Sequence, residues 1–316
     1  MYGAICTFNK QFLFRPTVNS TISPSIHRIF YAGMGGSVIP ADLANDYLYG
    51  EFDLCIIRNY TFPGIGNTDF VLFASYSGNT EETIAAFQDG LKKRVNAIVL
   101  THGGKLKSLA VENKIPVLHI PECIQPRCAS GYFFSAILAV LEKIGIIEGQ
   151  KKILTDLSAF LKSRQSIHEK EGKKLAGVLK GRVPVVYGPH ELEGTCRFWK
   201  IKFNENSKIP AFFNVFPELN HNEMVGWTQC STMNPYFIFL RSQFMHPRVA
   251  KRMDVMKSLF KGKIPVYDLQ LEGENRLQEM FDSLAIADYA STYLAMDYGV
   301  DPVKVDMVEN FKKSLG

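Results

Sequence analysis

Three hydroxyl side chains close together are the strongest chemical signal in the sequence. Ser75, Ser77 and Thr80 lie with a glycine and an asparagine directly after the apolar run 70–74, and a helical pattern over 81–91 follows. Backbone N–H groups, the helix dipole and short hydroxyl donors converge at such a junction, which favours binding of a phosphate group. Simple helix capping is the alternative, but one cap needs only one of these residues.

A glycine-rich turn earlier in the chain has the same setting. The strand pattern 28–31 leads into three glycines within 33–36 and then Ser37. Glycines allow the backbone to approach an anion closely, whereas tight helix–strand packing explains only one of the three. A dinucleotide site needs a further glycine where Val38 stands, and an acidic residue after the next strand, which runs into Arg58 instead. Both turns are therefore expected to face one crevice at the carboxyl edge of a parallel sheet.

The elements that position these turns alternate between strand and helix. We expect strands at 28–31, 54–57, 70–74, 97–100 and 117–120, with helices at 40–49, 80–92 and 130–144. After a charged helical stretch, 153–180, the alternation resumes with strands at 183–187, 211–215, 236–240 and 265–269, and helices at 191–204, 248–259, 275–296 and 305–315. Strands separated by helices predict mostly parallel sheets covered on both faces. The expected fold class is α/β with two similar subdomains, 20–150 and 151–316.

Composition narrows the class of protein. Hydrophobic residues make up 46% of the chain and charged residues 21%, which is typical of a globular protein. The net charge of +5, without a dense Lys/Arg block, permits an anionic substrate but gives no indication of nucleic-acid binding. The longest apolar run, 132–141, is too short to cross a bilayer. The six cysteines show no C-x-x-C spacing, so we expect free thiols in a cytoplasmic protein rather than disulfides or a metal site.

Five segments together resemble the signatures of sugar isomerase (SIS) domains, and more narrowly the bifunctional phosphoglucose/phosphomannose isomerase family. The segments are Gly33-Met34-Gly35-Gly36-Ser37, then Ser75-Tyr76-Ser77-Gly78-Asn79-Thr80-Glu81-Glu82-Thr83, Gln125-Pro126-Arg127, Asn204-Glu205-Asn206-Ser207-Lys208, and Pro217-Glu218-Leu219-Asn220-His221-Asn222-Glu223. The serine segment is shared by all SIS proteins, and the last two segments are far more specific. The resemblance covers about residues 28 to 315 and keeps the motifs in order.

The resemblance implies a fold of two SIS subdomains, a homodimer with a composite active site, and a role for each matching residue. The sugar phosphate would be bound by Gly36, Ser37, Ser75, Ser77 and Thr80. Arg127 would stabilise an enediolate, Glu205 would transfer the proton, His221 would open the sugar ring and Lys312 would assist at the ring oxygen. Such an isomerisation needs a base, a cation and a proton shuttle, and no metal or organic cofactor.

Considered alone, each of these residues also has an ordinary structural interpretation. Glu205 could be a solvated glutamate at a helix end, although Asn204 and Asn206 flank it and can orient its carboxylate. A lone histidine is more often structural, but His221 stands in a polar loop directly after an apolar strand, where site residues are common. Arg127 could cap neighbouring carbonyl groups. The resemblance, rather than the spacing, favours the catalytic interpretation.

The leading hypothesis is therefore an aldose–ketose isomerase that interconverts glucose 6-phosphate and fructose 6-phosphate through a cis-enediolate, with mannose 6-phosphate as a second candidate substrate. A non-catalytic sugar-phosphate sensor is one alternative, although no helix-turn-helix segment or basic patch accompanies the SIS pattern. Another SIS enzyme, such as the isomerase half of an amidotransferase, is a second. That alternative lacks support because no Cys nucleophile stands at the start of the chain; the nearest is Cys6.

Overall fold

The chain folds into two compact units. The computed structural model describes residues 1–18, 28–62, 64–66, 68–229 and 232–315. The first unit contains residues 7–162, and the second unit contains residues 1–6 and 163–316. The predicted start of the first subdomain, residue 20, and Cys230 lie outside the described residues. The two compact units divide between residues 162 and 163, at the end of helix α6, whereas the sequence predicts a domain boundary between residues 150 and 151. That domain boundary stays a prediction.

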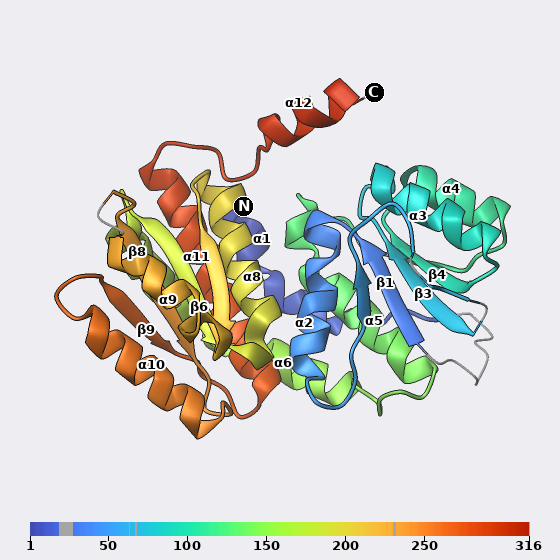
Figure 1. Ribbon diagram of the computed structural model, residues 1–316. Coiled ribbons are helices and arrows are strands. Elements are labelled where there is room, and N and C mark those ends of the chain that lie inside the picture. The colour runs from blue at the N-terminus through green and yellow to red at the C-terminus, as the bar shows by residue number, and fades with distance from the viewer. Residues whose placement is uncertain (19–27, 63, 67, 230–231, 316) are drawn as a thin grey trace. The chain divides into compact units, whose positions relative to one another are not determined.

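The first unit is a five-stranded, wholly parallel sheet with helices on both faces (Figure 1). Its strands are β1 (Arg28–Gly33), β2 (Cys55–Ile57), β3 (Asp69–Ala74), β4 (Asn96–Thr101) and β5 (Val117–His119), in the order β2-β1-β3-β4-β5. Its helices are α2 (Ile39–Tyr47), α3 (Glu81–Lys92), α4 (Gly104–Glu112), α5 (Ser130–Lys143) and α6 (Lys151–Ser163), with short 3-10 turns η1 (Phe8–Leu13), η2 (Gly35–Ser37) and η3 (Pro126–Cys128).

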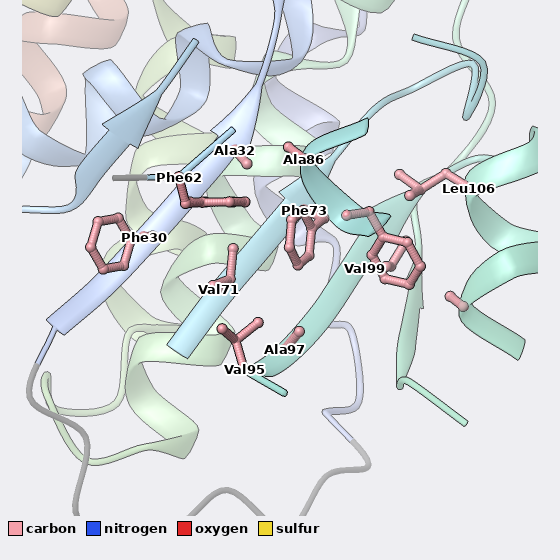
Figure 2. Close-up of a cluster of buried hydrophobic side chains, with 12 residues drawn as sticks. Phe30, Ala32, Phe62, Val71, Phe73, Ala86, Val95, Ala97, Val99 and Leu106 are labelled. Atoms are coloured by element: carbon pink, nitrogen blue, oxygen red, sulfur yellow. The ribbon is translucent and has the colours of Figure 1, made fainter. Parts of the chain in front are cut away.

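Alternating strand residues form the core of this unit. On one face, side chains from β1, β3 and β4 pack against α3 and α4, as Figure 2 shows. Phe73 of β3 lies at the centre of this cluster, edge-on to both Phe62 and Phe87. The intervening strand residues, such as Tyr31 and Leu72, are buried as well. The sequences of the central strands are therefore nearly continuous apolar runs, because both faces of a covered parallel sheet are buried.

The second unit repeats this layout with one strand fewer. Its strands are β6 (Val183–Pro189), β7 (Phe212–Phe216), β8 (Pro235–Arg241) and β9 (Val266–Gln270), all parallel and in the order β7-β6-β8-β9. Its longer helices are α7 (Gln165–Leu179), α8 (Glu193–Lys202), α10 (Pro247–Phe260), α11 (Arg276–Asp297) and α12 (Asp306–Leu315). Shorter elements are α1 (Tyr2–Cys6), η4 (His190–Leu192), the π-helical turn η5 (Phe203–Ser207), η6 (Glu218–Asn220), α9 (Glu223–Gly226) and η7 (Trp227–Gln229).

Helix α11 is largely buried within the second unit. It packs along α7 and also contacts α8 and the π-helical turn η5. On the other face of the sheet, aromatic residues of β6 and β8 pack against α10. The first helix, α1, also joins this unit, because Tyr2 lies edge-on to Tyr289 and the Cys6 thiol contacts the hydroxyl of Tyr289.

The predicted fold class, two units with parallel sheets flanked by helices, is confirmed, and most element boundaries agree within two or three residues. The main differences concern three helical segments, besides the short helix α9 and the 3-10 turns. Helix α4 was not predicted, the stretch 153–180 is two helices that meet at Arg164, and α1 was missed. Among the described residues, no helix is both long and apolar enough to span a membrane. The five described cysteines are free thiols.

Candidate functional site

The hydroxyl groups of the serine loop, residues 75–80, bond to one another and to the loop backbone. The Ser75 and Thr80 hydroxyl oxygens lie 2.8 Å apart, and the amide of Gly78 donates to the Ser75 oxygen at 3.1 Å. The amide of Asn79 donates to the Ser77 oxygen at 3.2 Å. Thr80 occupies the N-cap position of α3, but its side chain makes no capping hydrogen bond. The loop therefore has an organised structure that simple capping does not explain.

Several hydroxyl protons of this loop remain available to an anion. A serine hydroxyl has one proton to donate and two lone pairs that accept. In the bonds described above, Ser77 acts only as an acceptor, and the pair of Ser75 and Thr80 uses one of its two protons. Phosphate oxygens only accept, so these remaining donors suit a phosphate group. Ser77 is the exposed member of the set, while Ser75 is buried.

The glycine-rich turn lies beside the serine loop because β1 and β3 are neighbours. The Ser37 hydroxyl accepts a hydrogen bond from the amide of Tyr76 at 2.9 Å, and the Tyr31 hydroxyl donates to the carbonyl of Ser37 at 2.7 Å. These strands flank the point where the strand order reverses, which is where open α/β sheets bind ligands. Ser37 likewise keeps its proton for a ligand. The two turns that were predicted to share a crevice are thus joined by a hydrogen bond.

Arg127 reaches the same edge from η3. A Cβ atom at Gly36 would lie 2.6 Å from the amide nitrogen of Arg127 and 2.9 Å from its Cα, so these two backbones touch. Only glycine permits this approach. The Arg127 side chain is buried, with 2% of the residue exposed. The first unit therefore brings together Gly36, Ser37, the serine loop and Arg127, all of which the sequence assigned to the site.

The turn from β4 to α4 packs directly against the backbone of the serine loop. Gly78 and Gly104 both have positive φ, +68° and +73°. A Cβ on Gly78 would lie 1.8 Å from the carbonyl oxygen of Gly103, and a Cβ on Gly104 would lie 2.1 Å from that of Ser77. The Asn79 side chain accepts from the amide of Lys105 at 3.0 Å. Sequence reasoning missed this support, although two adjacent glycines, three and four residues after the end of a predicted strand, were a signal for it.

Tyr76 has a structural role that the sequence analysis did not predict. Its ring stacks on that of His102, and its hydroxyl donates to the carbonyl of Cys123 at 3.0 Å. The tyrosine therefore connects the serine loop to the segment that precedes Arg127. Burial raises the pKa of the Cys123 thiol to about 12, with the neighbouring Cys128 contributing next, so Cys123 stays protonated and unreactive.

Glu205 lies in the π-helical turn η5, which extends α8 at its carboxyl end. Single π-helical turns are rare and occur often at functional sites. Helix α11 holds the turn: the Asn206 side chain donates to the Ser291 hydroxyl at 2.9 Å, and the Ser207 hydroxyl donates to the Ser291 carbonyl at 2.7 Å. Lys208, in a left-handed conformation, ends the turn, and its ammonium donates to the Glu205 carbonyl. Glu205 itself is half-buried.

The expectation that the flanking asparagines orient the Glu205 carboxylate stays a prediction, and the hydrogen bonds of their side-chain amides give both residues a further role. Asn204 donates to the carbonyl of Ile209 at 2.8 Å, and Asn206 donates to Ser291. Both amides therefore stabilise the backbone of the turn. They position Glu205 by fixing the helix around it, because an amide that stabilises a π-helical turn determines where its side chains project.

His221 is exposed, in the loop that follows β7. Residues 217–223 are called the His221 loop below. Leu219 of this loop is buried in the core of the second unit, and the amide of His221 donates to the Glu218 carbonyl at 2.9 Å. An exposed imidazole on a loop with a buried anchor can serve as a proton donor or acceptor.

Glu205 and His221 lie at opposite edges of the same sheet. The chain leaves the carboxyl end of β6, returns along α8, and passes through η5 before β7 begins. Glu205 therefore lies toward the amino edge, whereas His221 follows β7 at the carboxyl edge. Strand β7 has five residues, which span about 16 Å at about 3.3 Å per residue. The two side chains of one chain cannot both reach adjacent atoms of one small substrate.

At the corresponding edge of the second sheet, a carboxylate of the protein itself accepts hydrogen bonds from the residues that follow β8. Ser242 follows β8 as Ser75 follows β3. The Ser242 hydroxyl donates to Glu279 of α11 at 2.5 Å, and the amide of Gln243 donates to the same carboxylate at 3.0 Å. Glu279 is fully buried, and burial raises the pKa of its carboxyl group. An anionic ligand is therefore expected at the edge of the first sheet only.

Lys312 lies on α12, a helix with no buried residue. Its ammonium pairs with Glu309 at 2.8 Å. No group of three or more His, Cys, Asp and Glu side chains suited to a metal ion is found among the described residues.

Comparison with known proteins places these features in a family. Residues 168–315 match the model for the bacterial phospho-glucose isomerase C-terminal SIS domain. A bifunctional phosphoglucose/phosphomannose isomerase from Caldicellulosiruptor bescii is 36% identical over 307 residues, covering 92% of this chain and 90% of that protein. One of the same name from Aquifex aeolicus is 33% identical, covering 91% and 90%.

A solved structure shows the same fold at much lower identity. The C-terminal domain of glucosamine-fructose-6-phosphate aminotransferase from Francisella tularensis superposes with a TM-score of 0.71 at 13% identity, covering 95% of this chain and 94% of that one.

Proposed function

The chain belongs to the bifunctional phosphoglucose/phosphomannose isomerase family, and we propose that it interconverts glucose 6-phosphate and mannose 6-phosphate with fructose 6-phosphate. The observation that carries this proposal is the pair of joined turns at the ends of β1 and β3, with hydroxyl protons left to donate. In a chain of this family, such an anchor suits the phosphate of a sugar substrate.

The anchor binds the part of the substrate that does not react. Ser37 and Ser77 donate to the phosphate oxygens, as does the one proton that the pair of Ser75 and Thr80 does not use between its own members, and Gly36 contributes its backbone beside them. Binding energy at the phosphate fixes C1 and C2 of the sugar relative to the catalytic groups. Binding of this kind lowers KM and also positions the reacting carbons.

The reaction moves one proton between two carbons. Glu205 removes the proton from C2 of the open-chain aldose, and the C2–H electron pair forms the C1–C2 double bond of a cis-enediolate while negative charge collects on O1. Glu205 then returns the proton to C1, and the hydrogen of the O2 hydroxyl is transferred to O1, which leaves a carbonyl at C2. Arg127 stabilises the oxyanion. His221 transfers the proton that opens the sugar ring, and Lys312 assists at the ring oxygen.

Two copies of the chain form each site in this proposal. Glu205 and His221 lie at opposite edges of one sheet, yet the ring oxygen and the C1–C2 bond that they act on are neighbours in the substrate. His221 of one copy therefore serves the site that contains Glu205 of another, in a homodimer with cyclic symmetry. The reaction itself requires no metal or organic cofactor, and a cytoplasmic location agrees with free thiols.

A coupled assay tests the activity. The purified chain is incubated with glucose 6-phosphate or mannose 6-phosphate, and formation of fructose 6-phosphate is followed. Turnover of glucose 6-phosphate by the native chain, with a loss of about 10³-fold or more in Glu205→Gln, is expected because a general base contributes about 10²–10⁴-fold. Near-native turnover in Glu205→Gln would exclude the mechanism. Binding of fructose 6-phosphate by calorimetry without turnover would instead support a sugar-phosphate sensor.

A further inference from the structure

The His221 loop is fixed at both ends although its histidine is exposed. Near its start, Leu219 is fully buried beside Phe216. At its end, Glu223 begins helix α9, and its side chain turns back toward the sheet. Between these anchors, Asn222 donates to Glu218 at 2.8 Å. Such a loop has little freedom for local motion.

Glu223 makes the connection to the sheet with both carboxylate oxygens. The Tyr187 hydroxyl, on β6, donates to one oxygen, and the side-chain amide of Asn214, on β7, donates to the other. The indole N–H of Trp227 donates to the Tyr187 hydroxyl at 2.8 Å, and the amide of Glu223 donates to Asn222 at 2.5 Å. Hydrogen bonds to a charged acceptor are stronger than neutral ones, so the carboxylate is a firm anchor.

The donors themselves have fixed orientations. The Tyr187 ring is fully buried among Phe216, Phe237 and Phe239. Burial, followed by the hydrogen bond to Glu223, raises the pKa of Tyr187, so its hydroxyl remains protonated and donates. The carbonyl oxygen of the Asn214 side chain accepts from the amide of Val215 at 2.8 Å, which leaves only its NH₂ group to face Glu223.

We propose that Glu223 and Tyr187 are positioning residues for His221. Their hydrogen bond ties the His221 loop to β6, one of the two inner strands of the second sheet, so that the exposed imidazole keeps one place and direction. This inference rests on the proposed function, because it assigns to His221 the ring-opening step. Neither residue needs to touch the substrate, and both act through the histidine alone.

Glutamine cannot replace Glu223 in this network, although it has the same shape. An NH₂ group facing Asn214 would meet another NH₂ group whose orientation is fixed. An NH₂ group facing Tyr187 would leave the phenol proton without an acceptor, because that hydroxyl already receives the Trp227 N–H. Either arrangement leaves a buried donor unsatisfied, so the loop must move.

A double-mutant cycle tests the inference. Kinetic constants for glucose 6-phosphate are measured for Glu223→Gln, His221→Gln and the double variant, with Tyr187→Phe as a second disruption of the same bond. Glu272→Gln is the matched control, since that glutamate is exposed. Circular dichroism and melting curves establish that each variant is folded. Residual turnover of His221→Gln remains measurable because sugar rings also open spontaneously in water.

The expected pattern is specific to positioning. Glu223→Gln and Tyr187→Phe lower kcat by about 10- to 100-fold with KM changed less than about 3-fold, because displacement of a catalytic group by about 1 Å costs about 100-fold. In the His221→Gln background, the same changes alter kcat by less than about 2-fold. Equal losses in both backgrounds, unchanged kcat in folded single variants, or native activity of His221→Gln would each overturn the inference. An inactive native chain, or an active Glu205→Gln, would instead overturn the proposed function.

Discussion

Replacing Gly36 by alanine should damage catalysis through Arg127. The added Cβ would lie 2.6 Å from the Arg127 amide nitrogen, 2.9 Å from its Cα and 2.9 Å from the carbonyl carbon of Pro126. All three atoms belong to the backbone, so no side-chain rotation relieves the overlap. Contacts of a real Cβ begin at 3.0–3.4 Å, and the backbone of η3 must therefore retreat by about 0.4 to 0.8 Å.

The kinetic cost follows from that displacement. A misplacement of about 1 Å costs about 100-fold in rate, so a shift of this size predicts a loss of about 6- to 40-fold in kcat, or about 1.1 to 2.2 kcal/mol of transition-state stabilisation. Overpacking also lowers the free energy of unfolding, by about 1–3 kcal/mol. The coupled assay gives kcat and KM, and thermal melting gives the stability.

Gly35→Ala is the matched control, one residue away. Gly35 has a φ of +52° and open space around its Cβ position. Alanine there costs about 1–2 kcal/mol of backbone strain but does not push on Arg127. We expect Gly35→Ala to lower the melting temperature while kcat stays within about 3-fold of the native value. If Gly36→Ala and Gly35→Ala have the same kcat, the proposed route through Arg127 is wrong.

Three further predictions concern the serine loop, the π-helical turn and the thiols. Ser77→Ala should raise KM by about 10-fold with little change in melting temperature, because its exposed hydroxyl loses a ligand contact worth about 1.5 kcal/mol; an unchanged KM would contradict this. Ser291→Ala removes the hydroxyl that accepts from Asn206, and should lower the free energy of unfolding by about 1–3 kcal/mol and also lower kcat. Denaturation and a steady-state assay measure the two effects, and unchanged values would show that the π-helical turn does not depend on α11. At pH 8 iodoacetamide should label the exposed Cys55 well before Cys123, because a thiol with a pKa of about 12 has about one thiolate in 10⁴ molecules at that pH. Mass spectrometry that finds Cys123 labelled first would show that burial does not keep this thiol protonated.

The strands, and the turns that follow β1 and β3, could be predicted from local sequence because their signals are local; that these turns bind phosphate stays a prediction. Residues 70–74 are apolar without interruption, and β3 is buried on both faces as that pattern requires. The turn at Ser37 contains three glycines: Gly33 and Gly36 are closely approached by other backbone atoms, and Gly35 has a positive φ. Helix α4 was missed because it is short and begins at a glycine pair, which resembles a loop.

The supports of the site depend on distant residues and could not be predicted in this way. Asn206 bonds to Ser291, which is 85 residues away in the sequence. Glu223, at the start of α9, bonds to Tyr187 on β6, and nothing in the local sequence pattern identifies that partner. The separation of Glu205 from His221 follows only from the order of elements around β7.

Mixing two variants that are impaired at different residues tests the central claim most directly. Glu205→Gln and His221→Gln chains are purified separately, unfolded and refolded together in equal amounts, and assayed with glucose 6-phosphate. A hybrid dimer then contains one site with both changes and one site with neither. Since random pairing makes half of the dimers hybrid, the account predicts about a quarter of native activity in the mixture, well above either variant refolded alone. Activity no higher than the mean of the two variants would contradict a site shared between two copies.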